Sequence, residues 1–228
     1  MNLLKSTIGL KIVMALTGIV LFGFVIGHML GNLQIFLGAD VLNDYAALLH
    51  ETAPLLWGTR IVLLLSVFGH IYSAVVLSKR SMAARPSAYK EKKWMGSSYA
   101  VRTMRWGGVI LLLFIVYHLL HFTVGVSVEP VFTKAVTCSD QSGSMDCGEV
   151  YSNVIRAFTN PFVALFYIVA QGALGLHLAH GLWSLCRTLG MQSESNSIMA
   201  KRASVAFGTL ITVGNCSIPI AVLFGFLS

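Results

Sequence analysis

The chain has 228 residues, of which 56% are hydrophobic and 11% are charged. Because a soluble globular domain carries about a quarter charged residues, this composition excludes an ordinary soluble enzyme. The formal net charge of +7 fits a membrane protein whose basic loops face anionic lipid on one side, and it does not require a nucleic acid partner.

Five runs without charged residues follow one another along the chain, at 12–39, 61–78, 106–128, 157–186 and 203–228. A helix needs about 20 apolar residues to cross a bilayer, and the shortest run is extended by the apolar residues that precede it. We therefore predict an all-α integral membrane protein with a single domain, residues 1–228. Its five transmembrane helices are expected at about 8–38, 55–79, 103–128, 157–187 and 203–228.

The basic residues are distributed unevenly between the two sides of this predicted bundle. Thirteen of the 16 Lys and Arg residues lie in the N-terminal segment or in the loops 79–105 and 187–202, whereas seven of the nine acidic residues lie in or beside the loops 39–56 and 129–156. Basic residues are retained on the cytoplasmic side during insertion. We expect a multi-pass protein of the inner (plasma) membrane with a cytoplasmic N-terminus and an external C-terminus.

Taken in chain order, the predicted helices differ most in their histidines. Six of the seven histidines lie inside the first four helices: His28 in the first, His70 in the second, His118 and His121 in the third, His177 and His180 in the fourth. An imidazole inside a bilayer is costly without a partner, and neutral imidazole is a ligand of haem iron. A hydrogen bond to a neighbouring helix is the structural alternative for any single histidine.

The depth of each histidine suggests how they pair. With a rise of about 1.5 Å per residue, His28 and either His118 or His121 lie toward the outside, whereas His70 and His177 lie toward the cytoplasm. A four-helix bundle with a fifth flanking helix can then hold two bis-histidine haems, one above the other. Small residues flank these histidines and permit either close helix packing or clearance for a macrocycle: Gly27, Gly31, Gly69, Ser73, Gly172, Gly175 and Gly181.

Five segments carry a resemblance to a known family. They are STIGLKIVMALTG at the start of the first helix, GHMLGNLQIF around His28, FGHIYSAVVL around His70, YHLLHF around His118 and LHLAHGLWS around His177. They resemble the cytochrome b subunit of succinate dehydrogenase and fumarate reductase, in the five-helix, two-haem class called the cytochrome b558 family. The resemblance runs the length of the chain. It implies an outer haem bound by His28 and His118 and an inner haem bound by His70 and His177, a choice that depth alone leaves open between His118 and His121.

The family implies a membrane anchor that does not itself oxidise succinate. It carries two haems b, joins an iron–sulfur subunit and a flavoprotein subunit on the cytoplasmic side, and passes electrons to a quinone, for which we expect menaquinone. The same path serves fumarate reduction in reverse. The basic inner loops fit this docking face.

Further site residues follow from the chemistry of these ligands. Haem propionates bind cations and hydrogen-bond donors, and the candidates for them and for the haem pocket are Lys11, Asn32, Arg102, Arg105, Trp183 and Arg187. Quinone chemistry moves protons as well as electrons, and the candidates near the outer haem are Gln34, His50 and Glu51. The external cysteines Cys138 and Cys147 are candidates for a disulfide.

The chain departs from the family at one position. Some members carry a membrane-embedded acid just before the fourth-helix ligand, where this chain has Gly175. We therefore expect transmembrane electron transfer to be electrogenic. Two other functions fit the histidines: a haem b anchor of another redox complex, such as a hydrogenase or formate dehydrogenase, and a haem-free transporter or structural membrane protein whose histidines relay protons.

Overall fold

The structure, a computed structural model, describes residues 5–84, 99–124, 150–193 and 195–228. All regular elements in these ranges are helical. Five stretches are long and apolar enough to cross a membrane: Thr7–Leu37, Ala53–Ala83, Arg102–Val124, Pro161–Thr188 and Ser197–Leu223. The chain is therefore an all-α, multi-pass membrane protein, as the composition predicted.

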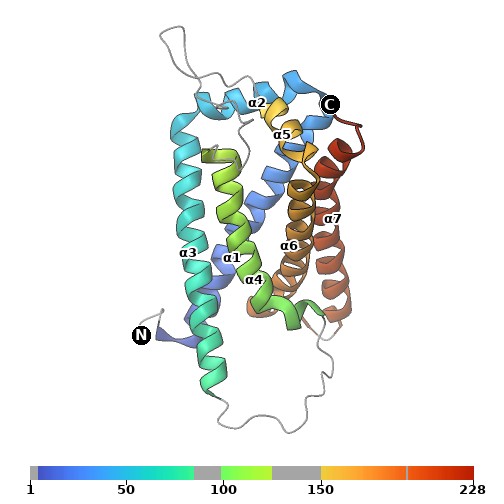
Figure 1. Ribbon diagram of the computed structural model, residues 1–228. Helices are drawn as coiled ribbons and strands as arrows, with labels where there is room; N and C mark the ends of the chain where they lie inside the picture. The colour runs from blue at the N-terminus through green and yellow to red at the C-terminus, as the bar shows by residue number, and fades with distance from the viewer. Residues whose placement is uncertain (1–4, 85–98, 125–149, 194) are drawn as a thin grey trace.

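Figure 1 shows the long helices side by side, with the short helices α2 and α5 at the end where the C-terminus lies. The described elements, in chain order, are α1 (Thr7–Asn32), η2 (Leu33–Leu37), α2 (Ala39–Glu51), α3 (Ala53–Ala83), α4 (Tyr99–His118), η3 (Leu119–Val124), α5 (Val150–Thr159), α6 (Pro161–Thr188) and α7 (Ser197–Leu223). The N-terminus lies at the opposite end of the bundle, as an odd number of crossings requires.

The helix ends differ from the predicted ranges where local signals end or begin a helix. Gly38 has a φ of 113° and separates η2 from α2, so much of the predicted loop 39–56 is helical. The Asn160 side chain accepts a hydrogen bond from the Phe162 amide at 3.0 Å, and Pro161 follows at the first helical position. This cap divides the predicted helix 157–187 into the end of α5 and the whole of α6.

The last predicted helix is also displaced along the chain. We expected residues 203–228 to be helical and residues 187–202 to form a loop. α7 instead begins at Ser197 and ends at Leu223, and α6 continues to Thr188. Lys201 and Arg202 therefore belong to the first turns of α7, because charged residues can extend a helix beyond its apolar run into the interfacial region.

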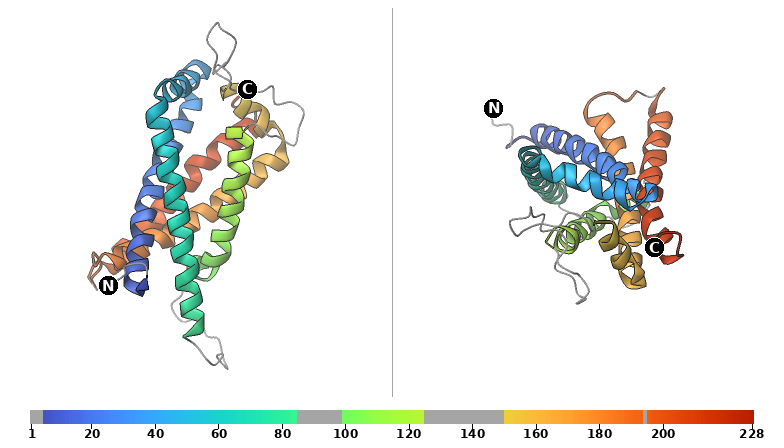
Figure 2. Two further views of the ribbon diagram at one scale, coloured as in Figure 1. Left: turned by 90° about the vertical axis from the view of Figure 1, so that its left-hand side faces the viewer. Right: turned by 90° about the horizontal axis from the view of Figure 1, so that it is seen from above.

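The long helices pack as two groups. α1 packs along α3, whereas α6 packs along both α4 and α7, and α1 also touches α6 and α7. Seen from above in Figure 2, α1 and α3 lie on one side and α6 and α7 on the other. Within the described ranges α3 makes at most marginal backbone contact with α4 and α6. The ring contact between His70 and His177 connects α3 to α6, and α7 flanks α6.

The contact between α6 and α7 depends on glycine. A Cβ on Gly175 would lie 2.8 Å from the Gly208 carbonyl oxygen and would also meet the Thr212 side chain. Asn215 Nδ2 on α7 donates to Gln171 Oε1 on α6 at 2.9 Å, whereas Thr212 Oγ1 donates to the Gly208 carbonyl oxygen within α7 at 2.9 Å. A side-chain hydrogen bond thus joins the two helices near the point where their backbones come closest.

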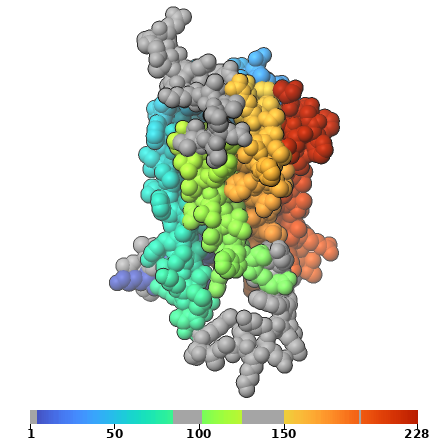
Figure 3. Space-filling model, in the orientation of Figure 1, coloured from blue at the N-terminus to red at the C-terminus, as the bar shows by residue number. Residues whose placement is uncertain are grey.

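Many large apolar side chains face outward. Leu65 on α3 is 67% exposed and Trp106 on α4 is 76% exposed. On the face shown in Figure 3, α4 lies between α3 and the pair α5 and α6. An apolar outer surface is unfavourable in water but is what the hydrocarbon core of a bilayer accepts. The exposed side chains agree with a position inside a membrane.

Candidate functional site

Four of the membrane histidines form two pairs that bridge the two helix groups. The ring centroids of His28 on α1 and His118 on α4 are 5.7 Å apart, and those of His70 on α3 and His177 on α6 are 6.2 Å apart. Each pair joins one helix of the α1–α3 group to one of the α4–α6 group. The pairs have the same members as those that the resemblance implies.

The spacing within each pair is that of two axial imidazoles on one metal ion. An imidazole nitrogen binds a metal at about 2 Å and lies about 1.1 Å from its ring centre, so two axial imidazoles place their ring centres about 6 Å apart. Both observed distances lie close to this value. Among the described residues no three His, Cys, Asp or Glu side chains converge on one point. Each donor set, two histidines at this spacing, is compatible with bis-histidine ligation of a haem.

The two pairs lie at different levels of the bundle. Tyr167 on α6 contacts His118, and His177 follows it ten residues later in the same helix. At about 1.5 Å per residue this separates the two levels by about 15 Å. The His28–His118 pair lies toward the end that carries α2 and α5, and the His70–His177 pair lies toward the end that carries the N-terminus.

Thr17 orients His70 in the second pair. Thr17 Oγ1 donates its proton to the Val13 carbonyl oxygen at 2.7 Å and lies 3.3 Å from His70 Nδ1. Since the hydroxyl has a single proton, it accepts from the Nδ1–H of His70. This hydrogen bond leaves His70 Nε2 unprotonated, which is the tautomer that binds a metal.

Tyr167 has the corresponding position in the first pair. Its hydroxyl lies 3.4 Å from His118 Nδ1 and 2.9 Å from His121 Nδ1. The His118 ring also faces His28, whereas the His121 ring contacts Tyr117, Phe122 and Tyr167. The structure therefore puts His118 next to His28, a choice that the depth of the histidines alone left open.

Three buried polar atoms near the second pair have no hydrogen-bond partner in the described structure. They are Ser73 Oγ, His177 Nδ1 and Trp183 Nε1. Ser73 lies one helical turn beyond His70, and Trp183 lies less than two turns beyond His177. A buried polar atom without a partner is destabilising. Acceptor atoms of a bound group, such as haem propionates, would be suitable partners for Ser73 Oγ and Trp183 Nε1, whereas His177 would contribute a ring nitrogen as a metal ligand.

The glycines near the histidines divide into two groups. A Cβ on Gly31 would meet the Tyr45 ring at 2.8 Å, and one on Gly69 would meet Thr17 at 3.2 Å, so these two glycines serve helix packing. A Cβ on Gly181, by contrast, would have no heavy atom within 4 Å. Gly181 follows His177 by four residues and shares its helix face. There is therefore free space beside His177.

The other predicted site residues lie further from the pairs. Lys11, Arg102 and Arg105 are exposed, and the Arg187 guanidinium lies 5.0 Å from the centre of the Trp183 ring. Asn32 ends α1, Gln34 lies in η2, and His50 and Glu51 end α2. No hydrogen bond or ring contact of these described residues joins them directly to either pair. Cys138 and Cys147 lie outside the described residues, and Cys186 and Cys216 are free thiols.

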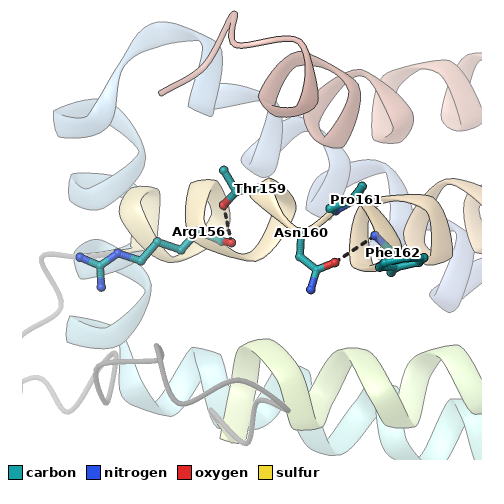
Figure 4. Close-up of a pocket in the computed structure, with 5 residues that line it drawn as sticks. All are labelled: Arg156, Thr159, Asn160, Pro161 and Phe162. Carbon is teal, nitrogen blue, oxygen red and sulfur yellow. Dashed lines mark hydrogen bonds between the residues drawn. The ribbon is translucent and has the colours of Figure 1, made fainter.

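A shallow surface hollow lies where α5 meets α6 (Figure 4). Arg156, Thr159, Asn160, Pro161 and Phe162 line it. In this view the Arg156 side chain extends away from the Asn160 amide. Both dashed hydrogen bonds join residues that are close in sequence, Thr159 to the Arg156 carbonyl oxygen and the Phe162 amide to the Asn160 side chain. None of these residues belongs to a histidine pair, and the hollow has no cluster of catalytic groups.

Our sequence analysis did not identify Thr17 or Tyr167 as neighbours of the paired histidines. Gly18 also lies beside His70, since a Cβ at this position would be 3.5 Å from His70 Cε1, which is an ordinary contact distance. A hydroxyl group in an apolar helix is the only signal that the sequence offered. Such a signal shows that a partner is needed but not which residue it is.

Comparison with known proteins identifies no relative: no protein-family model, no curated protein and no solved structure matches the chain. What the fold and the site define is therefore a class, a multi-pass all-α membrane protein with two histidine pairs set between its helices.

Proposed function

We propose that this chain is the di-haem cytochrome b membrane anchor of a succinate:quinone oxidoreductase, or of the corresponding fumarate reductase. The observation that carries the proposal is the pair of facing histidine couples, with ring centres 5.7 and 6.2 Å apart at two levels of the bundle. Two bound haems b would supply one-electron transfer along the bundle. The segments that resemble this family contain the same four histidines.

The residues of the chain have distinct roles in this proposal. His28 and His118 hold the outer haem, and His70 and His177 hold the inner haem. The hydroxyl of Thr17 fixes the tautomer of His70. Ser73 and Trp183, whose buried polar atoms have no partner among the described residues, would donate hydrogen bonds to the inner haem, and the nearby Arg187 would provide a cation.

The partners are those that the resemblance implies, and the orientation rests on the charge distribution. The basic loops are cytoplasmic by the positive-inside rule and dock the iron–sulfur subunit, which in turn carries the flavoprotein subunit. Menaquinone binds near the outer haem, at the end of the molecule where η2 and α2 lie. Gln34, His50 and Glu51 are its polar contacts on this proposal.

The absence of an acid at position 175 has a structural counterpart. Any side chain at Gly175 would meet the backbone of α7 at Gly208, so this position cannot hold a carboxylate without separating α6 from α7. Electron transfer through the chain is then not compensated by protons at this position. Succinate oxidation by menaquinone would draw on the proton gradient.

A haem analysis of the purified chain tests the proposal. We expect a sharp visible band after reduction with dithionite and two protoporphyrin equivalents per chain in the pyridine haemochrome assay. A proton-relaying transporter gives no band, and its absence would contradict the proposal. Copurification of a flavoprotein with succinate dehydrogenase activity separates the proposed complex from a hydrogenase or formate dehydrogenase.

A further inference from the structure

One hydroxyl group connects the two histidines of the third membrane helix. Tyr167 Oη lies 2.9 Å from His121 Nδ1 and 3.4 Å from His118 Nδ1. Tyr167 is 5% exposed and His121 is 4% exposed. Since buried polar groups are destabilising without hydrogen bonds, the three side chains must share the few protons that they have.

The position of this hydroxyl is fixed by aromatic packing. The Tyr167 ring lies 5.2 Å from the ring of Phe114, 5.0 Å from that of Phe158 and 5.8 Å from that of Phe122, between ring centroids. These rings come from α4, α5 and η3. Such contacts hold an aromatic side chain in one orientation. Tyr167 therefore presents its hydroxyl to the two histidines without rearrangement.

Counting protons shows that the two hydrogen bonds depend on each other. A phenol donates one proton, and a neutral imidazole carries one protonated nitrogen. If Tyr167 donates to His121 Nδ1, it accepts from the Nδ1–H of His118, and His118 Nε2 is left unprotonated. If Tyr167 donates to His118 Nδ1 instead, the tautomers are exchanged. Only the first arrangement fits a metal ion between His118 and the facing ring of His28.

We propose that Tyr167 is a positioning residue that holds His118 in the metal-binding tautomer and His121 in a tautomer whose Nε2 carries the proton. This inference rests on the proposed function, because it concerns the ligand of the outer haem. A ligand imidazole that donates its other N–H becomes a more basic ligand. It stabilises ferric over ferrous iron and so lowers the reduction potential of the outer haem.

A redox titration of the full purified chain with both haems bound tests this role. The variant Tyr167→Phe removes the acceptor of the His118 proton but keeps the ring. The matched control is Tyr117→Phe, since Tyr117 belongs to the same aromatic cluster but its hydroxyl makes no hydrogen bond to either histidine in the described structure. We expect Tyr167→Phe to move the potential of one haem to a more positive value, with the other haem unchanged. The control should move neither.

A second variant gives an independent result if Tyr167→Phe does not retain the outer haem. His121→Phe removes the acceptor of the Tyr167 proton and leaves the phenol in place. A hydroxyl that no longer donates is a weaker acceptor, so we expect two haems and a smaller positive shift in the same haem. Loss of a haem from His121→Phe would show that His121 is a ligand and overturn the proposal.

The proposed role of Tyr167 would also be overturned by unchanged potentials in Tyr167→Phe, or in a His121→Phe variant that retains both haems. An equal shift of the potential in the control Tyr117→Phe would overturn it as well. The outcome for the wild type separates this inference from the proposed function. A wild-type chain without haem contradicts the function itself. A wild-type chain with two haems and unshifted variants contradicts only the role of Tyr167.

Discussion

Replacing Thr17 with valine should weaken the binding of the inner haem. Valine has the shape of threonine but no hydroxyl, so the packing stays and the 3.3 Å hydrogen bond to His70 Nδ1 is lost. His70 is then free to rotate and to place its proton on either nitrogen. In the part of the chain that the structure describes, Thr17 makes the one side-chain hydrogen bond to His70 Nδ1, and the backbone of Met14 is a further hydrogen-bond partner of His70.

The expected magnitude follows from comparable sites. Loss of a hydrogen bond to a ligand histidine reduces metal affinity by about 10- to 100-fold, which corresponds to about 1.4 to 2.7 kcal/mol. Affinity changes of this kind are found mainly in the dissociation rate. The assay is the rate of haem transfer from the detergent-solubilised protein to excess apomyoglobin, measured in a His118→Ala background so that only the inner haem is present.

Thr17→Ser is the matched control, because it keeps the hydroxyl and removes the methyl group. A Cβ on Gly69 would lie 3.2 Å from that methyl group, which shows how closely the methyl approaches α3. We expect haem loss from the serine variant at close to the wild-type rate. Equal rates in Thr17→Val and the parent chain would refute the role of the hydroxyl. Equal loss in both variants would assign the effect to packing.

Three further predictions follow from the packing and from the histidine pairs. Gly175→Ala puts a methyl group 2.8 Å from the Gly208 carbonyl oxygen and should destabilise the protein by about 1–3 kcal/mol in thermal unfolding. The control Gly27→Ala has open space around the new methyl group and should leave the stability unchanged. Equal effects of the two substitutions would contradict the packing argument. His180→Ala should retain both haems in the haemochrome assay, and loss of one would shift the ligand register by a turn. In sealed vesicles of the complete complex, an uncoupler should slow succinate oxidation by menaquinone, and an unchanged rate would rule out electrogenic transfer.

The uncharged runs of the sequence predicted which segments form the long helices, but not where each helix begins and ends. The runs without charged residues located all five long helices because a membrane helix needs about 20 apolar residues in succession. Their ends were less accurate, because they depend on particular caps. Asn160 and Pro161 divide one uncharged run into the end of α5 and the beginning of α6. Gly38, with its positive φ, separates η2 from the beginning of α2.

The sequence also could not predict the role of each glycine near His177. Gly175 and Gly181 lie on the same predicted helix and both flank His177, so the sequence could not assign them different roles. In the structure a Cβ on Gly175 would meet α7, whereas one on Gly181 would meet nothing within 4 Å. The difference depends on which helix lies opposite each face, and no local pattern contains that information.

The sequence by itself determined the membrane class, the number of spans, the supply of histidines and the charge difference between the two ends, because these properties depend on residue type and on order along the chain. The tertiary structure shows His118 rather than His121 next to His28, a choice that helix depth left open and that only the resemblance had made. It alone showed that Thr17 and Tyr167 lie within hydrogen-bond distance of the paired histidines. Successive residues of a helix point about 100° apart. Which of them meet is therefore set by the rotation and packing of whole helices against one another.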